Sequence, residues 1–364
     1  MSVAESMNKP TTESQDGLVS SDAGLAWATD VLVQAGLDED DAQIVAASLI
    51  FAEMRGVKTH GLLRLGIYVD RILAGGINGQ AKSDIIADLG ALVVIDADAA
   101  PGAVSGTYAC DIAVERARKH GVGCVVVRNG NHFGASAYFT NRIADAGFLG
   151  LAACNTESVM SAPGGGRPVL GTNPLAVAVP LPYANRPQLD MATTTVSQGA
   201  LLVAKANNEA IPLGWAVDVN GQPTTSPIDG LAGALTPAGG PKGFGLAFVV
   251  DTLVALAGAK VSPSVTALEA DPREPQQLGQ FFMAIRADAA ESLDGYQERI
   301  SALVDAIHNS GINGHRPMAP GEPEMARERQ SNGKFAVSPS TLEALSSVAA
   351  KVGTPPLALI PATV

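Results

Sequence analysis

The middle of the chain alternates short apolar runs with helical stretches, and this alternation restricts the fold more than any other feature. Runs rich in β-branched residues are typical of buried strands, and the stretches between them end at Gly121 and Gly147, as helices commonly do. The sequence therefore predicts an α/β sheet with helices on its faces. We expect strands at 91–95, 124–127, 149–154, 176–179, 189–191 and 281–285, helices at 106–119, 138–146 and 196–207, and another that opens within 239–245 and ends near 256.

Both ends of the chain are rich in helical patterns, which suggests that they contribute to one domain. Ser21 or Asp22 can cap a first helix that ends at Gly36. Further helices are expected at 40–54, 62–74, 293–308, 323–330 and 339–352, and a surface excursion at 258–277. This divides the chain into a disordered leader at 1–20, a helical region from 21–80 and 288–352, an α/β region at 81–287 and a tail at 353–364.

Charge and composition narrow the possible partners. The formal net charge of −12 argues against nucleic acid, because phosphate backbones need a basic surface. Hydrophobic residues make up 46% of the chain and aromatic residues only 4%, so small aliphatic side chains must fill a large core.

Cys110, Cys124 and Cys154 lie in or beside apolar stretches and predict buried free thiols in a reducing cytoplasm. No stretch is long and apolar enough for a membrane span, and no grouping has zinc-ligand spacing, so we expect no membrane and no metal.

The segment from Arg55 to Arg64 is the strongest candidate for chemistry. It places His60 among Arg55, Lys58 and Arg64 in an otherwise acidic chain. A titratable imidazole beside guanidinium groups can move a proton on an anionic substrate. The alternative is a helix-entry segment with solvated charges. If a helix begins directly after His60, the four-residue spacing puts His60 and Arg64 on one face.

Two further polar groups follow expected strands. His132 comes just after the run that ends near Arg128, where α/β folds place ligand-binding groups. Asp190 emerges from a short apolar run and needs a partner if it is buried. A histidine would serve as that partner, and a helix cap is the alternative. The remaining histidines, His120, His308 and His315, have weaker contexts and are expected to be structural.

The glycine-rich segment 239–245 is the best candidate for binding a phosphate. Glycines permit close approach of the backbone, the following helix directs its first amides outward, and Lys242 adds a charge. The alternative is a tight turn with a surface lysine. The segment is not a P-loop, and no GxGxxG occurs in the chain, so the ordinary Rossmann fingerprint is absent.

Taken together, these segments resemble the malate/L-lactate dehydrogenase family of the second type, which includes L-sulfolactate dehydrogenase, ureidoglycolate dehydrogenase and diketogulonate reductase. The resemblance covers about residues 22–335. It rests on motifs in family order: RGVKTHGLLRLGIYVDRILAGGI, RNGNHFGASAYF, LGTNPLAVAVP, LDMATTT, IPLGWAVDVNGQPTTSP, GGPKGFGLAFVVD, FFMAI and PGEPE. It implies a non-Rossmann, L-sulfolactate dehydrogenase-like fold, a mixed sheet with helices on both faces and a helical domain built from both termini.

The resemblance also implies an activity. Members transfer a hydride between a nicotinamide cofactor, NAD or NADP, and C2 of a small 2-hydroxy or 2-oxo acid of the malate, lactate, sulfolactate or ureidoglycolate type. A reductase of cyclic 2-imino acids and a non-catalytic metabolite-binding relative are the alternatives. The family forms homodimers with the active site at the subunit interface. The helical region would then serve substrate binding and dimerisation, and the α/β region would bind the cofactor.

Particular residues carry the implied roles. His60 matches the family's proton-handling histidine, Asp190 its partner and Arg64 the arginine that binds the substrate carboxylate, while His132 is the alternative acid or base. Lys58 replaces a frequent Asp and would make the cleft more positive, which suits a doubly anionic substrate. The other substrate-binding candidates are Arg55, Thr59, Thr172 and Asn173. The cofactor-binding candidates are Asn155, Gln188, Leu189, Asp190, Met191, Ala192, Pro241, Lys242, Gly321, Glu322 and Pro323.

Overall fold

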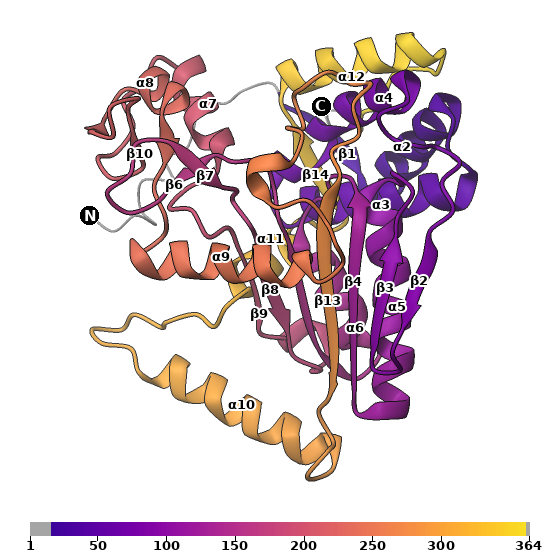
Figure 1. Cartoon of the computed structure of the whole chain (residues 1–364), viewed down its shortest axis with the longest axis vertical. Helices are drawn as coiled ribbons and strands as arrows, with labels where there is room; N and C mark the ends of the chain where they lie inside the picture. The colour runs from indigo at the N-terminus through magenta and orange to yellow at the C-terminus, as the bar shows by residue number, and fades with distance from the viewer. Residues whose placement is uncertain (1–15, 362–364) are drawn as a thin grey trace.

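The computed structural model describes residues 16–361, and its centre is a seven-stranded mixed sheet (Figure 1). The strand order is β2-β3-β4-β13-β5-β8-β9, in which only β3 and β4 pair in parallel. The six expected strands all form, which confirms the α/β class, and the edge strand β2, which was not expected, joins them. Their bounds are β2 Asp84–Asp88, β3 Leu92–Asp96, β4 Val122–Gly130, β13 Leu278–Arg286, β5 Phe148–Cys154, β8 Leu175–Ala178 and β9 Gln188–Met191.

Helices cover both faces of this sheet because its strands are apolar on both sides. Phe282 packs with the helices α5 (Gly102–His120) and α6 (Ser136–Asp145), whereas the adjacent Phe281 packs with α9 (Pro241–Ala255) on the other face. This alternation is the two-residue period of a strand. Gly106 lets α5 lie close to α6, since a Cβ there would collide with the ring of Phe139.

The two chain ends meet in a helical unit, as expected. It contains α2 (Ser21–Ala35), α3 (Glu39–Met54), α4 (Leu65–Ala74) and α12 (Pro339–Val352), which share one core. The unit also contains a two-stranded sheet in which β1 (Gly17–Ser20) pairs with β14 (Lys334–Val337).

The expected ends of the chain need correction. The leader does not reach residue 20, because Gly17–Ser20 form β1 and Val19 is fully buried; residues 1–15 lie outside the described part. The tail also packs on the helical unit, since the indole nitrogen of Trp27 donates to the Pro355 carbonyl and Leu357 joins the core.

A smaller unit packs beside the large sheet. Its five-stranded sheet has the order β11-β10-β12-β6-β7, and α7 (Gln198–Ala206) and α8 (Pro227–Ala232) cover it. The sequence did not predict these strands, because two or three residues carry no visible period. Their bounds are β6 Met160–Ser161, β7 Pro168–Leu170, β10 Ala216–Val217, β11 Pro223–Thr224 and β12 Ala234–Leu235.

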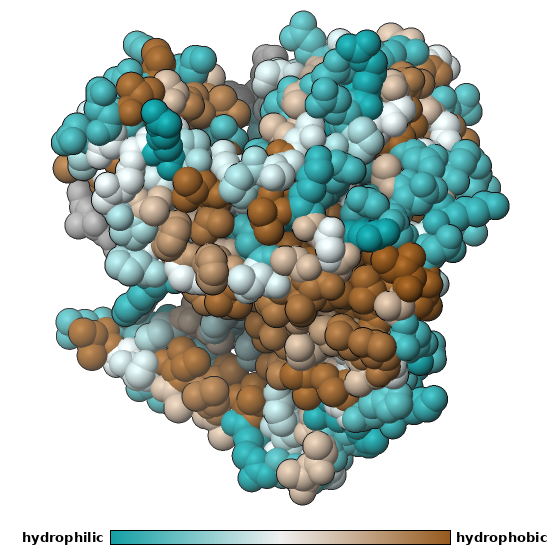
Figure 2. All heavy atoms as spheres, viewed as in Figure 1, coloured by the Kyte–Doolittle hydropathy of each residue, from teal (hydrophilic) through white to brown (hydrophobic). Residues whose placement is uncertain are grey.

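The 288–352 region is less uniform than expected. Helix α10 (Leu293–Asn309) extends away from the body and has no buried residue, whereas α11 (Glu322–Gln330) returns toward the large sheet (Figure 1). Figure 2 shows hydrophobic side chains gathered on the face that α9 and α10 share. Residues 258–277, expected as a surface excursion, contain the turn η4 (Ser262–Ser264) and bury Leu268 and Gln276. No helix among residues 16–361 is long and apolar enough to cross a membrane.

Candidate active site

A cavity of about 590 Å³ lies where the helical unit, the large sheet and the smaller unit meet. Such a volume is in the range of roughly 300–1,000 Å³ that is common for small-molecule and cofactor sites. The predicted site residues that line it are Arg55, Thr59, His60, Arg64, His132, Thr172, Gln188, Leu189, Asp190, Met191, Ala192 and Gly321.

Two short 3₁₀ turns, η1 (Lys58–His60) and η2 (Leu62–Arg64), carry the histidine and the arginine of the strongest motif. The expected helix directly after His60 is therefore wrong, because α4 begins only at Leu65. The buried carboxylate of Glu53 accepts a hydrogen bond of 2.8 Å from the Leu62 amide, and it leaves no room for a Cβ at Gly61. His60 and Arg64 thus both line the cavity through this turn and not through helical spacing.

The two candidate histidines lie against each other. The imidazoles of His60 and His132 stack with centroids 5.6 Å apart and planes 20° from parallel. The Thr59 hydroxyl lies 3.0 Å from Nδ1 of His60, and the Tyr68 hydroxyl lies 2.6 Å from Nδ1 of His132. Each ring is therefore oriented by a hydroxyl at Nδ1, which leaves Nε2 for a ligand. Tyr68 was not predicted, although it follows Arg64 by one helical turn.

Both imidazoles are held neutral. Burial, with the nearby Arg64 guanidinium, lowers the pKa of His60 to about 4. Burial, with His60 and Arg64, lowers the pKa of His132 well below its usual range. Desolvation disfavours the charged form, and a second cation beside the first adds to this effect. At neutral pH both rings are therefore uncharged.

Asp190 lies on β9 and opens onto the same cavity, but its partner is not a histidine. Its Oδ2 accepts a hydrogen bond of 2.8 Å from the Ala137 amide at the start of α6. No hydrogen bond joins it to His60 or His132 within residues 16–361. The interpretation as a helix cap is the one that the structure supports, although the helix differs from the expected one. Enclosure by protein raises the pKa of Asp190 to about 6.

Asn155 and Asn173 lie beneath the cavity and do not line it. Both side-chain amides donate to the buried carboxylate of Asp251 on α9, each at 2.9 Å, and the Ser262 hydroxyl donates to it at 2.7 Å. The network fixes the loops that carry Thr156 and Thr172 at the cavity wall. In the sequence, Asp251 is visible only as an acidic residue inside an apolar helix.

The candidates at the start of α9 lie outside the cavity. Pro241 and Lys242 are exposed, although Ala238, just before the helix, donates to the Thr193 carbonyl at 2.9 Å and so adjoins the end of β9. Glu322 accepts from the Ala319 amide and contacts Nε2 of His308 at 2.8 Å. Like Pro323, it does not line the cavity.

Acidic side chains that the sequence analysis did not select also line the cavity. They are Glu157, Glu269 and Glu324. The guanidinium of Arg64 donates from Nε to the Thr59 carbonyl at 2.7 Å and from Nη1 to Glu269 at 3.2 Å. Glu324 belongs to the PGEPE motif, whereas Glu157 and Glu269 lie in no motif that would distinguish them from surface acids in the sequence.

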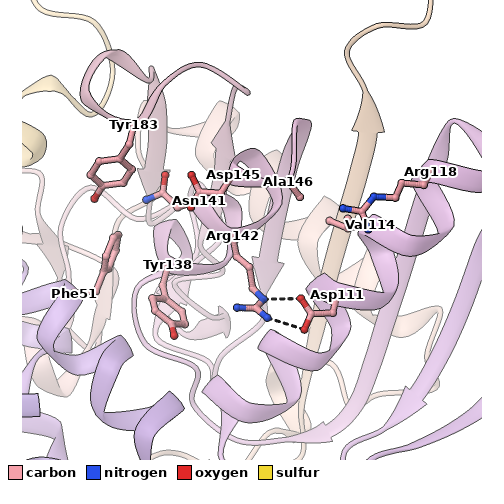
Figure 3. A pocket seen from close by; sticks show the side chains of 10 residues that line it. All are labelled: Phe51, Asp111, Val114, Arg118, Tyr138, Asn141, Arg142, Asp145, Ala146 and Tyr183. Carbon is pink, nitrogen blue, oxygen red and sulfur yellow. Dashed lines mark hydrogen bonds and ion pairs between the residues drawn. The ribbon is translucent and has the colours of Figure 1, made fainter. Parts of the chain in front are cut away.

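A second hollow of about 590 Å³ lies between α3, α5 and α6 (Figure 3). Most of its charged groups are already paired: Arg142 bonds Asp111 at 2.6 and 2.8 Å, and Asp145 pairs with Arg186. The guanidinium of Arg118 lies over the Phe148 ring. None of the predicted site residues lines it. The predicted site residues that line a cavity therefore all line the first one.

Comparisons with known proteins agree with this site and fold. The family model described as Malate/L-lactate dehydrogenase matches residues 19–346. L-sulfolactate dehydrogenase of Methanocaldococcus jannaschii is 34% identical over 327 residues, covering 89% of this chain and 94% of that relative. The solved structure of sulfolactate dehydrogenase from the same organism superposes with a TM-score of 0.87 at 33% identity, covering 93% of this chain and 98% of the other.

Two further relatives carry a cofactor in their names. Ureidoglycolate dehydrogenase (NAD(+)) of Escherichia coli is 35% identical over 278 residues, covering 76% of this chain and 79% of that relative. (2R)-3-sulfolactate dehydrogenase (NADP(+)) of Chromohalobacter salexigens is 33% identical over 286 residues, covering 77% and 84%. The chain therefore belongs to the malate/L-lactate dehydrogenase family of NAD(P)-dependent 2-hydroxy-acid dehydrogenases.

Proposed function

We propose that His60 handles the proton and Arg64 binds the carboxylate in the interconversion of a small 2-hydroxy acid and its 2-oxo acid. The observation that carries the proposal is a neutral imidazole and a guanidinium on one turn of the same cavity wall. The nicotinamide cofactor, when bound, accepts or supplies the hydride at C2. A malate, lactate, sulfolactate or ureidoglycolate type of acid presents the hydroxyl and carboxylate that these two side chains require.

The hydroxyl at Nδ1 defines how His60 works. When Nδ1–H donates to the Thr59 hydroxyl, Nε2 is unprotonated and can take the proton of the substrate hydroxyl. In the reverse direction the same nitrogen returns it. Burial raises the pKa of Tyr68, so this phenol keeps its proton and can donate it to Nδ1 of His132. His132 then carries its proton on Nε2, where it can donate a hydrogen bond to the substrate oxygen.

The cavity wall supports a dinucleotide along β9. Gln188, Leu189, Met191 and Ala192 line it on one side, and Gly321 meets them with a positive φ of 85° that brings its backbone close to Gln188. We infer that this edge holds the nicotinamide end of NAD or NADP. Asp190, whose pKa of about 6 leaves it mostly ionised at neutral pH, faces the same space.

We further propose a cytoplasmic homodimer with the site at the subunit interface. Helix α10 has no buried residue, and Leu246, Phe248 and Val249 of α9 and Leu303 of α10 are exposed. An exposed apolar face of this kind marks an interaction surface. All three cysteines are unpaired, in keeping with a reducing compartment.

The test is an absorbance assay of nicotinamide oxidation and reduction with malate, lactate, sulfolactate and ureidoglycolate and their 2-oxo forms, run with both cofactors. Turnover of at least one 2-oxo acid is expected. Turnover of a cyclic 2-imino acid alone would move the reaction to the carbon–nitrogen bond. Cofactor binding without any turnover would favour a non-catalytic relative. Sedimentation of the same sample tests the dimer, and a monomer with full activity would contradict a site that needs two copies.

A further inference from the structure

We propose that Glu157, with Glu269, restricts the substrate to a 2-hydroxy acid with a single negative charge, whose far end is uncharged or cationic and carries N–H or O–H donors. The inference rests on the proposed function and narrows its substrate class. Both carboxylates line the cavity that contains His60 and Arg64.

Arg64 has room for one anion. Its Nε is already bonded to the Thr59 carbonyl, and its Nη1 lies 3.2 Å from Glu269. The Glu269 side chain is 70% exposed, so this ion pair is weak and a substrate carboxylate can replace it. Once the carboxylate next to C2 occupies the guanidinium, a second anionic group of the substrate would have to share the single positive charge of this arginine.

No other cation of the cavity is free to take a second anion. Arg55 lines the wall, but its guanidinium lies 3.7 Å from Glu328 and bonds the Tyr183 hydroxyl at 3.2 Å. Lys58, which the sequence suggested for a doubly anionic substrate, is exposed, does not line the cavity and interacts with Glu53. The neutral histidines add no positive charge at neutral pH.

Glu157 makes the cavity unfavourable for a second negative charge. Among residues 16–361 it forms no ion pair within 4 Å, and burial raises its pKa while the Arg64 guanidinium and the Leu268 amide act in the opposite direction. Like charges interact strongly where water is largely excluded. A carboxylate can instead accept hydrogen bonds from an amide, ureido or ammonium group. The same side chain thus repels one class of substrate and binds the other.

The experiment compares two substrates that differ in one group. The full-length enzyme with reduced cofactor is assayed with 2-oxosuccinate, a dianion, and with 2-oxosuccinamate, in which a carboxamide replaces the far carboxylate. We expect the carboxamide to have the higher kcat/KM by about tenfold or more. Glu157→Gln should reduce that ratio by about tenfold, mainly through a lower KM for the dianion, and Glu269→Gln should reduce it less because Glu269 is exposed.

Glu343→Gln on the exposed surface of α12 is the matched control and should leave the ratio unchanged. A wild-type preference for the dianion would overturn the inference alone, whatever the variants do. An unchanged ratio in a folded Glu157→Gln variant would overturn it as well. Absence of turnover with every 2-oxo acid and both cofactors would overturn the proposed function and this inference with it.

Discussion

Two turns carry the strongest signals for ligand binding in the sequence, and the fold treats them in opposite ways. The turn at 58–64 is enclosed, so that His60 and Arg64 line a cavity walled by β9, α7 and the 268–269 loop. The turn at 239–245 begins α9 in the open, with Pro241 and Lys242 exposed. Both turns contain residue types suited to ligand binding, but only the first is enclosed by protein within a single chain.

Enclosure changes what a charged group can do. Inside the cavity, burial lowers the pKa of His60 to about 4, so its imidazole is unprotonated at neutral pH. At the start of α9, solvent and salt screen Lys242, so its attraction for a phosphate is small unless something covers it. The comparison predicts large effects from changes at the first turn and small effects at the second.

His60→Ala should have the largest effect. Loss of a positioned proton-transfer group lowers turnover by about 10²- to 10⁴-fold, while the Kd of the cofactor should change little because the imidazole is not on the β9 edge. Steady-state kinetics and cofactor titration measure the two quantities. His120→Ala, at the end of α5, is the matched control. Near-normal turnover by His60→Ala would assign the proton to His132.

Asp251→Ala tests whether α9 supports the site through the hydrogen bonds on its buried face, as opposed to contacts at its N-terminus. The change leaves Asn155, Asn173 and Ser262 without their shared acceptor. We expect a loss of about 2–4 kcal/mol in the free energy of unfolding, measured by urea denaturation. Thr252→Ala, on the exposed side of the same helix, should change it by less than about 0.5 kcal/mol. Equal effects of the two changes would show that the network contributes nothing particular.

The pH profile tests the enclosure of His60 directly. A folded pKa of about 4 means that the imidazole of His60 stays neutral as the pH falls through 6.5. At pH 5.5, kcat/KM for oxidation should therefore be about tenfold higher than it would be if His60 had the usual histidine pKa of about 6.5. Asp190, with a pKa of about 6, titrates in the same window. The profile is therefore also measured in Asp190→Asn. A fall centred near pH 6.5 that persists in this variant would contradict an enclosed His60.

The sequence predicted six of the seven strands of the large sheet, the shared terminal unit and twelve residues of the cavity wall, because each depends on a local pattern or motif. It could not predict that Asp251 accepts hydrogen bonds from Asn155, Asn173 and Ser262, since this requires three segments to converge in space. The helical spacing of His60 and Arg64 failed for a similar reason: the Glu53 carboxylate, seven residues before His60, caps the turn and excludes a continuous helix. Glu157 resembles any surface acid until the fold encloses it.

Lys242→Ala should have the smallest effect and decides whether the open turn takes part at all. Ala238 bonds Thr193, so a cofactor that starts at Ala192 extends toward the first amides of α9. An exposed ion pair contributes up to about 1 kcal/mol, so the Kd of the cofactor should rise by up to about fivefold and depend less on salt. Lys119→Ala, at the exposed end of α5, is the control. If Lys242→Ala changes neither affinity nor salt dependence, the glycines at 239–245 form a turn that binds no phosphate.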